Sequence, residues 1–218
     1  YTVEDLGAIE GLVPTITGMN ASGHLSGYVD AATGPRAVHF TGTAWAYVPG
    51  VATYSLATAI NDRGDIAGYH FAPEGFRAFR YTRSSNATTT IAPLAGGNFA
   101  IGFAINATGE VVGYGNSSSG TRGWRAAPDG PTVMLPTLGG TFGMACGIND
   151  SGKVVGAATT VSGHQHPYSV DAGNNVTEIV PFDGATGFGE ACAVDASGQV
   201  GGFATSGNVT RGFASAGG

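Results

Sequence analysis

The chain has 218 residues, of which 38 are glycine, 42% are hydrophobic and only 11% are charged. This glycine content without a collagen period indicates many tight turns, and the apolar content excludes a disordered chain. The net charge of −6 and the lack of basic runs argue against nucleic acid as a partner. No apolar run reaches the roughly 18 residues that a membrane-spanning helix needs, so membrane insertion is not expected.

The first predicted element is a strand over residues 1–6. The sequence starts at Tyr1 without a methionine, directly in this strand, and we interpret that start as the mature end left after removal of a signal peptide. Together with the low charge and the abundance of Ser, Thr, Asn and Gly, it predicts a secreted, periplasmic or cell-surface protein.

One pattern then recurs five times along the chain: an Asn or Asp, a Gly three residues later, an apolar pair and a second Gly. Its anchor residues are Asn20, Asn61, Asn106, Asn149 and Asp195, which are 41 to 46 residues apart. An Asx side chain in a turn bonds to the backbone two residues on, and Gly accepts the left-handed conformation that closes the turn. Each copy therefore predicts a β-hairpin, and turn chemistry explains the five Asx residues better than a ring of cation ligands does.

Two further strands follow each hairpin. The third strands are expected at 36–40, 77–81, 122–126, 166–170 and 211–215, and the fourth at 44–48, 88–94, 132–138 and 176–182. Four strands in about 43 residues are typical of a propeller blade. We therefore predict an all-β, five-bladed β-propeller with four antiparallel strands per blade. It forms a single domain, with repeats of about 7–48, 49–94, 95–138, 139–182, and 183–218 plus 1–6.

The fifth unit ends after its third strand. The N-terminal strand 1–6 would then complete the last blade, close the ring and hide the sheet edges that otherwise invite aggregation. A solenoid would instead need capped ends.

The leading strand and the hairpins also carry the motifs of one known family. These are Tyr-x-Val-x-Asp-Leu-Gly at 1–7, Leu-Gly-Gly at 138–140, Ala-Ile-Asn-x-x-Gly-x-Val-Val-Gly at 104–113 with close variants at 59–68 and 147–156, and Arg-Ala-Phe at 77–79. The chain resembles the extracellular HAF-repeat proteins of bacteria. The resemblance implies a bacterial secreted or surface protein. It implies no catalytic mechanism, so no functional residue is carried over.

Three carboxylates are candidates for chemistry. Glu190 begins the innermost strand of the fifth unit, where the other units have Thr15, Leu56, Ile101 and Met144. With Glu10 and Asp183 in loops expected nearby, it can form an acidic cluster for acid–base catalysis or for calcium. The alternative is three solvated carboxylates at the rim.

Three histidines are candidates for a metal. His164 and His166 are expected on one strand face, and either His70 or Asp183 is the candidate for a third ligand from another loop, as a zinc site requires. The alternative is surface histidines, and no other cofactor is expected.

Aromatic and cationic residues are candidates for ligand binding. Trp124 and Tyr168, with Trp45, are expected to be exposed and able to stack on sugar rings. Arg122 and its counterparts Arg36, Arg77 and Arg211 either form a ring for anions or bond locally to neighbouring blades, and the local role is favoured.

Cys146 and Cys192 occupy equivalent positions on adjacent inner strands. Side chains related by the ring symmetry do not converge, so two buried free thiols are expected rather than a disulfide.

Two functions fit these features. The favoured one is a monomeric binding or scaffold module that recognises a glycan or an extracellular protein. The alternative is a hydrolase or lyase with a single site at the propeller mouth around Glu190.

Overall fold

The computed structural model describes residues 2–215, which form five antiparallel sheets in chain order. The first sheet contains β1 (Thr15–Met19), β2 (Leu25–Ala31), β3 (Gly34–Phe40) and β4 (Trp45–Tyr47). The second contains β5 (Ser55–Ile60), β6 (Ile66–Ala72), β7 (Gly75–Thr82) and β8 (Ala87–Ile91), with the 3-10 helix η1 (Arg83–Ser85) before β8.

The third sheet contains β9 (Ala100–Ile105), β10 (Val111–Ser117), β11 (Gly120–Ala126) and β12 (Thr132–Met134). The fourth contains β13 (Gly139–Ile148), β14 (Val154–Thr160), β15 (Gln165–Val170) and β16 (Val176–Glu178). After η2 (Gly184–Thr186), the fifth sheet contains β17 (Gly189–Val194), β18 (Val200–Ser206) and β19 (Val209–Ser215). The predicted all-β fold with four antiparallel strands per unit is thus confirmed for four of the five units.

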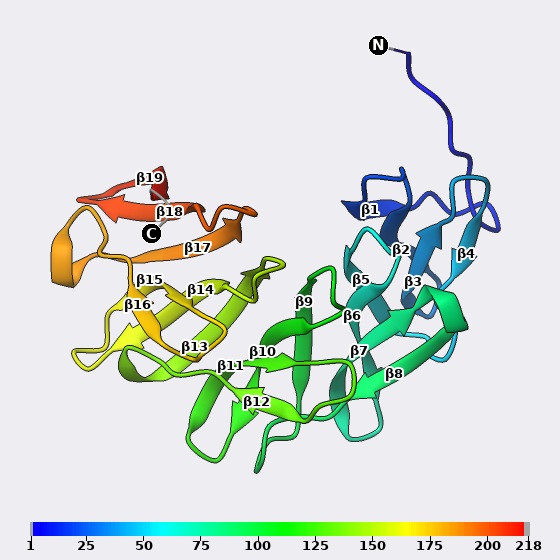
Figure 1. Ribbon diagram of the computed structural model, residues 1–218. Coiled ribbons are helices and arrows are strands. Elements are labelled where there is room, and N and C mark those ends of the chain that lie inside the picture. The colour runs from blue at the N-terminus through cyan, green and yellow to red at the C-terminus, as the bar shows by residue number, and fades with distance from the viewer. Residues whose placement is uncertain (1, 216–218) are drawn as a thin grey trace.

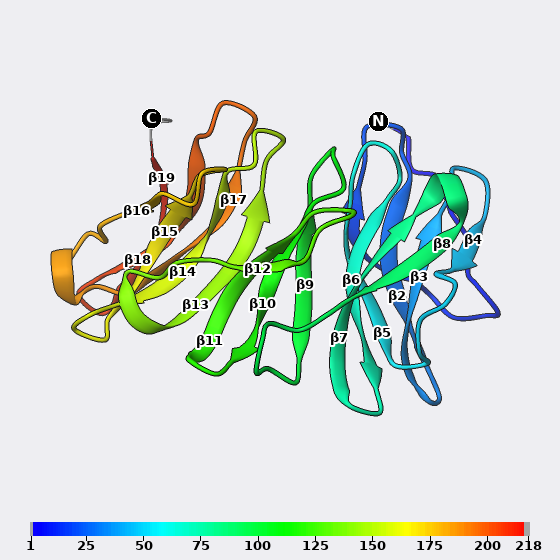
Figure 2. The same ribbon diagram turned by 60° about the horizontal axis from the view of Figure 1, so that its bottom comes forward.

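The five sheets follow one another along an arc, with the first and fifth at its two ends (Figures 1 and 2). Within residues 2–215 no strand joins these two ends. The arc is therefore open in this structure, and closure into a ring stays a prediction.

The Asx hairpins form as the sequence predicts. In the first, Oδ1 of Asn20 accepts the backbone N–H of Ser22 at 3.0 Å and of His24 at 2.9 Å, and Gly23 has a φ of 75°. The φ of this glycine lies in the left-handed region that other residues rarely adopt. The anchor residues are thus turn formers.

The same Asn side chains also join successive sheets. Each Nδ2 donates to the backbone carbonyl of the next anchor residue, over the pairs Asn20–Asn61 (3.0 Å), Asn61–Asn106 (2.9 Å), Asn106–Asn149 (3.3 Å) and Asn149–Asp195 (2.9 Å). Asp195 has no N–H group in its side chain, so this series of donors ends at the fifth sheet.

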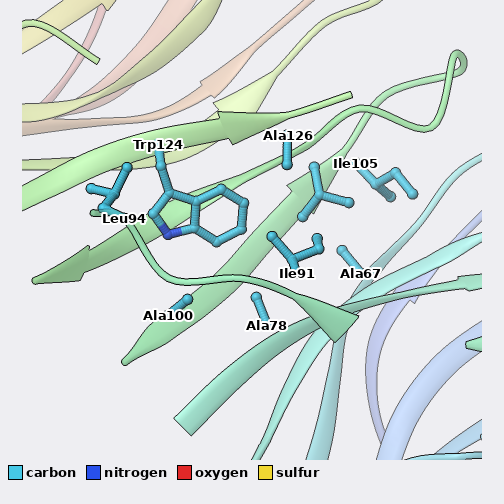
Figure 3. Packing of buried hydrophobic residues seen from close by; sticks show 9 residues of the cluster. Ala67, Ala78, Ile91, Leu94, Ala100, Ile105, Trp124 and Ala126 are labelled. Carbon is cyan, nitrogen blue, oxygen red and sulfur yellow. The ribbon is translucent and has the colours of Figure 1, made fainter. Parts of the chain in front are cut away.

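The hydrophobic core lies between neighbouring sheets rather than within one centre. Between the second and third sheets, the buried indole of Trp124 packs with Ile91, Leu94 and the small residues Ala78 and Ala100 (Figure 3). Small side chains on one face leave room for large ones on the next, as in any close-packed interior. Burial of a large apolar side chain contributes about 1.5–3 kcal/mol, so each junction stabilises the arc.

The N-terminal segment differs from its prediction. Residues 2–8 contain no strand, and the fifth sheet has three strands, so the expected fourth strand from 1–6 is not paired there; Tyr1 lies outside the described residues. Instead, the segment lies against β4, where the indole N–H of Trp45 donates to the carbonyl of Leu6 at 3.0 Å. Gly7 and Gly11, with φ of 70° and 79°, turn the chain back onto the first sheet.

None of the helices in the described residues is long and apolar enough to cross a membrane.

Candidate functional site

The three candidate carboxylates do not come together. Glu190 lies on β17 and accepts a hydrogen bond from the Cys146 thiol of β13 at 3.2 Å. Glu10 bonds to the Tyr47 hydroxyl at 2.8 Å at the opposite end of the arc, and Asp183 accepts the Gly207 N–H at 2.6 Å. The acidic cluster expected from the sequence is therefore not formed, because each carboxylate is engaged on a different element.

Cys146 and Cys192 are both free thiols. Burial, and then the neighbouring Glu190 carboxylate, strongly raise the pKa of Cys146, which therefore stays a protonated donor. Cys146 is half-buried and Cys192 is exposed, so the expectation of two buried thiols is wrong, while the expectation that both are free is confirmed. Cys192 lies on the fifth sheet, the last of the five sheets formed by residues 2–215.

The three candidate metal ligands are separated in the same way. His166 on β15 is buried and its Nδ1 bonds to Glu178 at 2.5 Å, while His164 lies in the turn before that strand. His70 lies on β6, two sheets away, where burial and then Arg77 lower its pKa. Across residues 2–215, no three His, Cys, Asp or Glu side chains are grouped to hold a metal ion.

Two of the candidate sugar-stacking residues are in the core. Trp124 and Tyr168 are both 0% exposed, so the expectation that they present a surface platform is wrong. Trp45 is half-buried. The repeat indicates this burial. The equivalent residues in the first two sheets are Val38 and Phe79, and a position on the third strand that is apolar in every unit is a core position.

The repeated arginines act locally. Arg77 donates to the carbonyl of Asn98 at 2.6 Å, Arg122 donates to that of Thr141, and the Arg36 guanidinium lies 3.6 Å from the centre of the Tyr47 ring. Asn98 and Thr141 both belong to the following unit. These contacts support the local role that the sequence favoured, and Arg122 is engaged rather than free for an anionic ligand.

A second set of cations, which the sequence analysis did not single out, joins the sheets on the side of the Asx turns. Arg80 donates to the carbonyl of Gly109 at 3.0 Å, and Arg125 to that of Gly152 at 3.2 Å. Each thus reaches the turn glycine of the next sheet. In the fourth sheet the equivalent residue is Ser169, which is too short to reach.

A cavity of about 570 Å³ opens beside Ser169, between the fourth and fifth sheets. Lys153 takes over the missing contact, since its Nζ donates to the carbonyl of the equivalent turn glycine, Gly198, at 3.0 Å. Polar and charged side chains line part of the wall, namely Ser151, Lys153, Ser169, Asp171, Asn175, Thr177, Glu178 and Ser215, and Ala172, Ile179 and Val200 complete it.

The carboxylates of this cavity are held in place by their neighbours. Asp171 accepts hydrogen bonds from the side chain and the backbone N–H of Asn175, both at 2.8 Å, and these bonds lower its pKa. Glu178 is fixed by His166. The cavity thus combines one ammonium, two carboxylates, hydroxyls and an amide. These groups can bind a hydroxyl-rich ligand through hydrogen bonds.

Comparison with known proteins supports the fold. No family model matches the chain, and no curated protein matches its sequence. TolB from Acinetobacter baumannii is similar in structure, with a TM-score of 0.56 and 10% identity over 95% of this chain and 56% of that chain. The chain thus spans about half the length of TolB. The gluconolactonase XC5397 from Xanthomonas campestris gives a TM-score of 0.47 and 10% identity over 86% of this chain and 68% of that chain. The likeness to TolB shows a shared, propeller-like all-β fold.

Proposed function

We propose that the chain is a secreted or periplasmic binding module of the HAF-repeat type, which takes a glycan in the cavity between the fourth and fifth sheets. One observation carries the proposal. The inter-sheet arginine of the second and third sheets is replaced by Ser169 at the junction where the cavity of about 570 Å³ opens. In a repeat protein, a binding site can form where one unit lacks a contact that other units make. Here the missing contact lies beside a space that is open to solvent.

The chemistry of the lining favours a sugar. Sugar hydroxyls both donate and accept, and the cavity offers the Lys153 ammonium as a donor and the Asp171 and Glu178 carboxylates as acceptors. Because Trp124 and Tyr168 are buried, these hydrogen bonds, rather than stacking, would supply the affinity.

The substitution Ser169→Arg tests this proposal. It introduces the arginine of the second and third sheets, and the long cationic side chain would occupy part of the cavity, so it should weaken glycan binding while the fold stays intact. Binding of a panel of neutral, acidic and amino oligosaccharides would be measured by saturation-transfer NMR on the wild type and the variant. Ser119→Arg, in the exposed β10–β11 turn, adds the same charge elsewhere and should leave binding unchanged. Equal binding by both variants would refute the site, and a wild type that binds no member of the panel would refute the glycan.

The hydrolase or lyase alternative rests on Glu190, a partly exposed carboxylate on an innermost strand. If it acts as an acid or base, Glu190→Gln should abolish turnover of ester and glycoside substrates while far-UV circular dichroism is unchanged. Activity that survives this substitution would end the alternative.

A further inference from the structure

The N-terminal segment contacts the first sheet in the way that the last strand of one sheet, or the loop after it, contacts the next sheet along the chain. Leu6 precedes Asn20 by the same interval that separates the buried Leu135 from Asn149. The bond from Trp45 to the carbonyl of Leu6 (3.0 Å) has close counterparts where Thr88 bonds to that of Pro49 (2.6 Å) and Thr132 to that of Ala92 (2.7 Å). Residues 2–6 therefore hold the place of a fourth strand, but no strand of residues 2–215 pairs with them.

The surface around this segment is uncovered. Val3 is 100% exposed, and on β1 Ile16 and Met19 are 52% and 71% exposed. In the second sheet, by contrast, the equivalent strand β5 contains only buried and half-buried residues, because the first sheet covers it. The first sheet and the N-terminal segment thus form one half of an inter-sheet junction.

The fifth sheet has the complementary half. Its third strand, β19, has no fourth strand along its outer edge within the described residues, and five of its seven residues are exposed. The equivalent strand β15 has five of its six residues buried. An open edge of this kind is a template for pairing with another strand.

The pairing of the third and fourth strands in the complete sheets predicts which residues of β19 and of the N-terminal segment would face each other. Trp124 pairs with Met134 and Arg125 with Val133, one and two residues before the buried Leu135. Counted in the same way from Leu6, Phe213 would face Asp5 and Ala214 would face Glu4.

The charges fit this register. In the fourth sheet His166 bonds to Glu178, the residue opposite Tyr168, at 2.5 Å; in the first, Arg36 lies on Tyr47, the residue opposite Val38, at 3.6 Å. Both pairs run diagonally from the third strand to the fourth. At the equivalent diagonal, Arg211 of β19 would meet Asp5, so a cation again meets an acceptor.

We propose that the fifth sheet of a second copy of this chain docks on the first sheet and the N-terminal segment, with β19 of one copy paired to residues 3–5 of the other. The chain's own fifth sheet lies at the far end of the arc, as both views show (Figures 1 and 2), and four Asn contacts hold the sheets in that arrangement. A second copy brings the fitting edge without any change in the arc. This contact joins different surfaces, so it builds head-to-tail assemblies.

Cysteine crosslinking tests the contact in a background with Cys146→Ser and Cys192→Ser. One copy carries Glu4→Cys, the other carries Ala214→Cys, and the two are mixed and oxidised, so that only contact between copies can join them. We expect a crosslinked heterodimer, and none when Ser119→Cys, in the exposed β10–β11 turn, replaces Ala214→Cys.

The expected pair of Asp5 and Arg211 gives a second test, in which light scattering measures assembly. Asp5→Arg or Arg211→Asp alone should abolish assembly, and mixing the two variants should restore it.

Two results would overturn the proposal. A chain that carries both Glu4→Cys and Ala214→Cys and crosslinks only within the monomer would show that the arc closes on itself. A lack of any crosslink, with a monomer at all protein concentrations, would show that both halves stay uncovered.

Discussion

At the scale of single residues, the side chain of each anchor Asn both holds its own turn and bonds to the next sheet, and these two roles can be separated by mutation. In Asn149, Oδ1 holds the turn by accepting the Lys153 N–H at 2.9 Å, and Nδ2 donates to the Asp195 carbonyl at 2.9 Å. Asn149→Asp keeps the acceptor and removes the donor. We expect a loss of about 0.5–1.5 kcal/mol in the free energy of unfolding, since a partly buried hydrogen bond is removed. Urea denaturation would measure it. Asp195→Asn is the matched control and should change the stability little, because no sixth anchor carbonyl follows within the described residues.

Two buried histidines predict how stability depends on pH. Burial is the main cause that lowers the pKa of both His39 and His70 from the ordinary value of 6.5. The unfolded chain therefore binds protons at these sites at a higher pH than the folded chain does, and stability should fall as the pH drops below 6.5. Hydrogen bonds lower the pKa of Asp171 and of Asp195, so these carboxylates affect the pH dependence of stability only at more acidic pH.

The double variant His39→Gln/His70→Gln checks this cause. Its free energy of unfolding, measured in urea between pH 7 and pH 5, should change less with pH than that of the wild type. Equal slopes would mean that other groups produce the dependence.

How far the sequence could predict single residues depends on whether the repeat fixes them. The Asx turns and the local role of Arg77 follow from chemistry that each unit repeats. The burial of Trp124 follows from the repeat and not from the residue type alone, because Val38 and Phe79 occupy the same position in the first two sheets. Ser169 matters only because arginines precede it in equivalent positions, and that contact becomes visible only once the sheets are packed together.

At the scale of the strand, the second hairpin glycine is a packing requirement. A Cβ on Gly113 would lie 1.9 Å from the Ile101 carbonyl oxygen and 2.9 Å from the Trp124 ring. This is where the pairing of β9 and β10 shifts register between Val112 and Gly113. The sequence pattern marked the glycine, but it did not show that the glycine accommodates a bulge.

Gly113→Ala should therefore destabilise the protein by about 1–3 kcal/mol or more, because the backbone of β9 cannot move aside without losing its own pairs. Gly130→Ala, where the nearest atom to the added Cβ is 3.4 Å away, is the control and should cost much less. The urea midpoints of the two variants would be compared. Equal midpoints would mean that the bulge adapts.

At the scale of the whole molecule, the number of units and their order follow from the period of the sequence, but closure does not. Curvature is set by how each pair of sheets packs, and small changes at the four junctions add up along the arc. The N-terminal residues bear strand-like alternation, yet Gly7 and Gly11 turn them onto the first sheet. Alternation alone does not specify which edge a strand will join.

The open arc also predicts where unfolding begins. The junction between the second and third sheets buries nine core residues, whereas the cluster shared by the fourth and fifth sheets has three, Val155, Ala191 and Val200. Chains built of repeats can unfold unit by unit when their interfaces differ in strength. We expect the amide hydrogens of β18 and β19 to exchange at a lower free energy of opening than those of β10 and β11. Native-state hydrogen exchange in low urea, at protein concentrations too low for assembly, measures this difference. If all five sheets instead exchanged with one common free energy, the arc would be a single cooperative unit and its open end would carry no separate weakness.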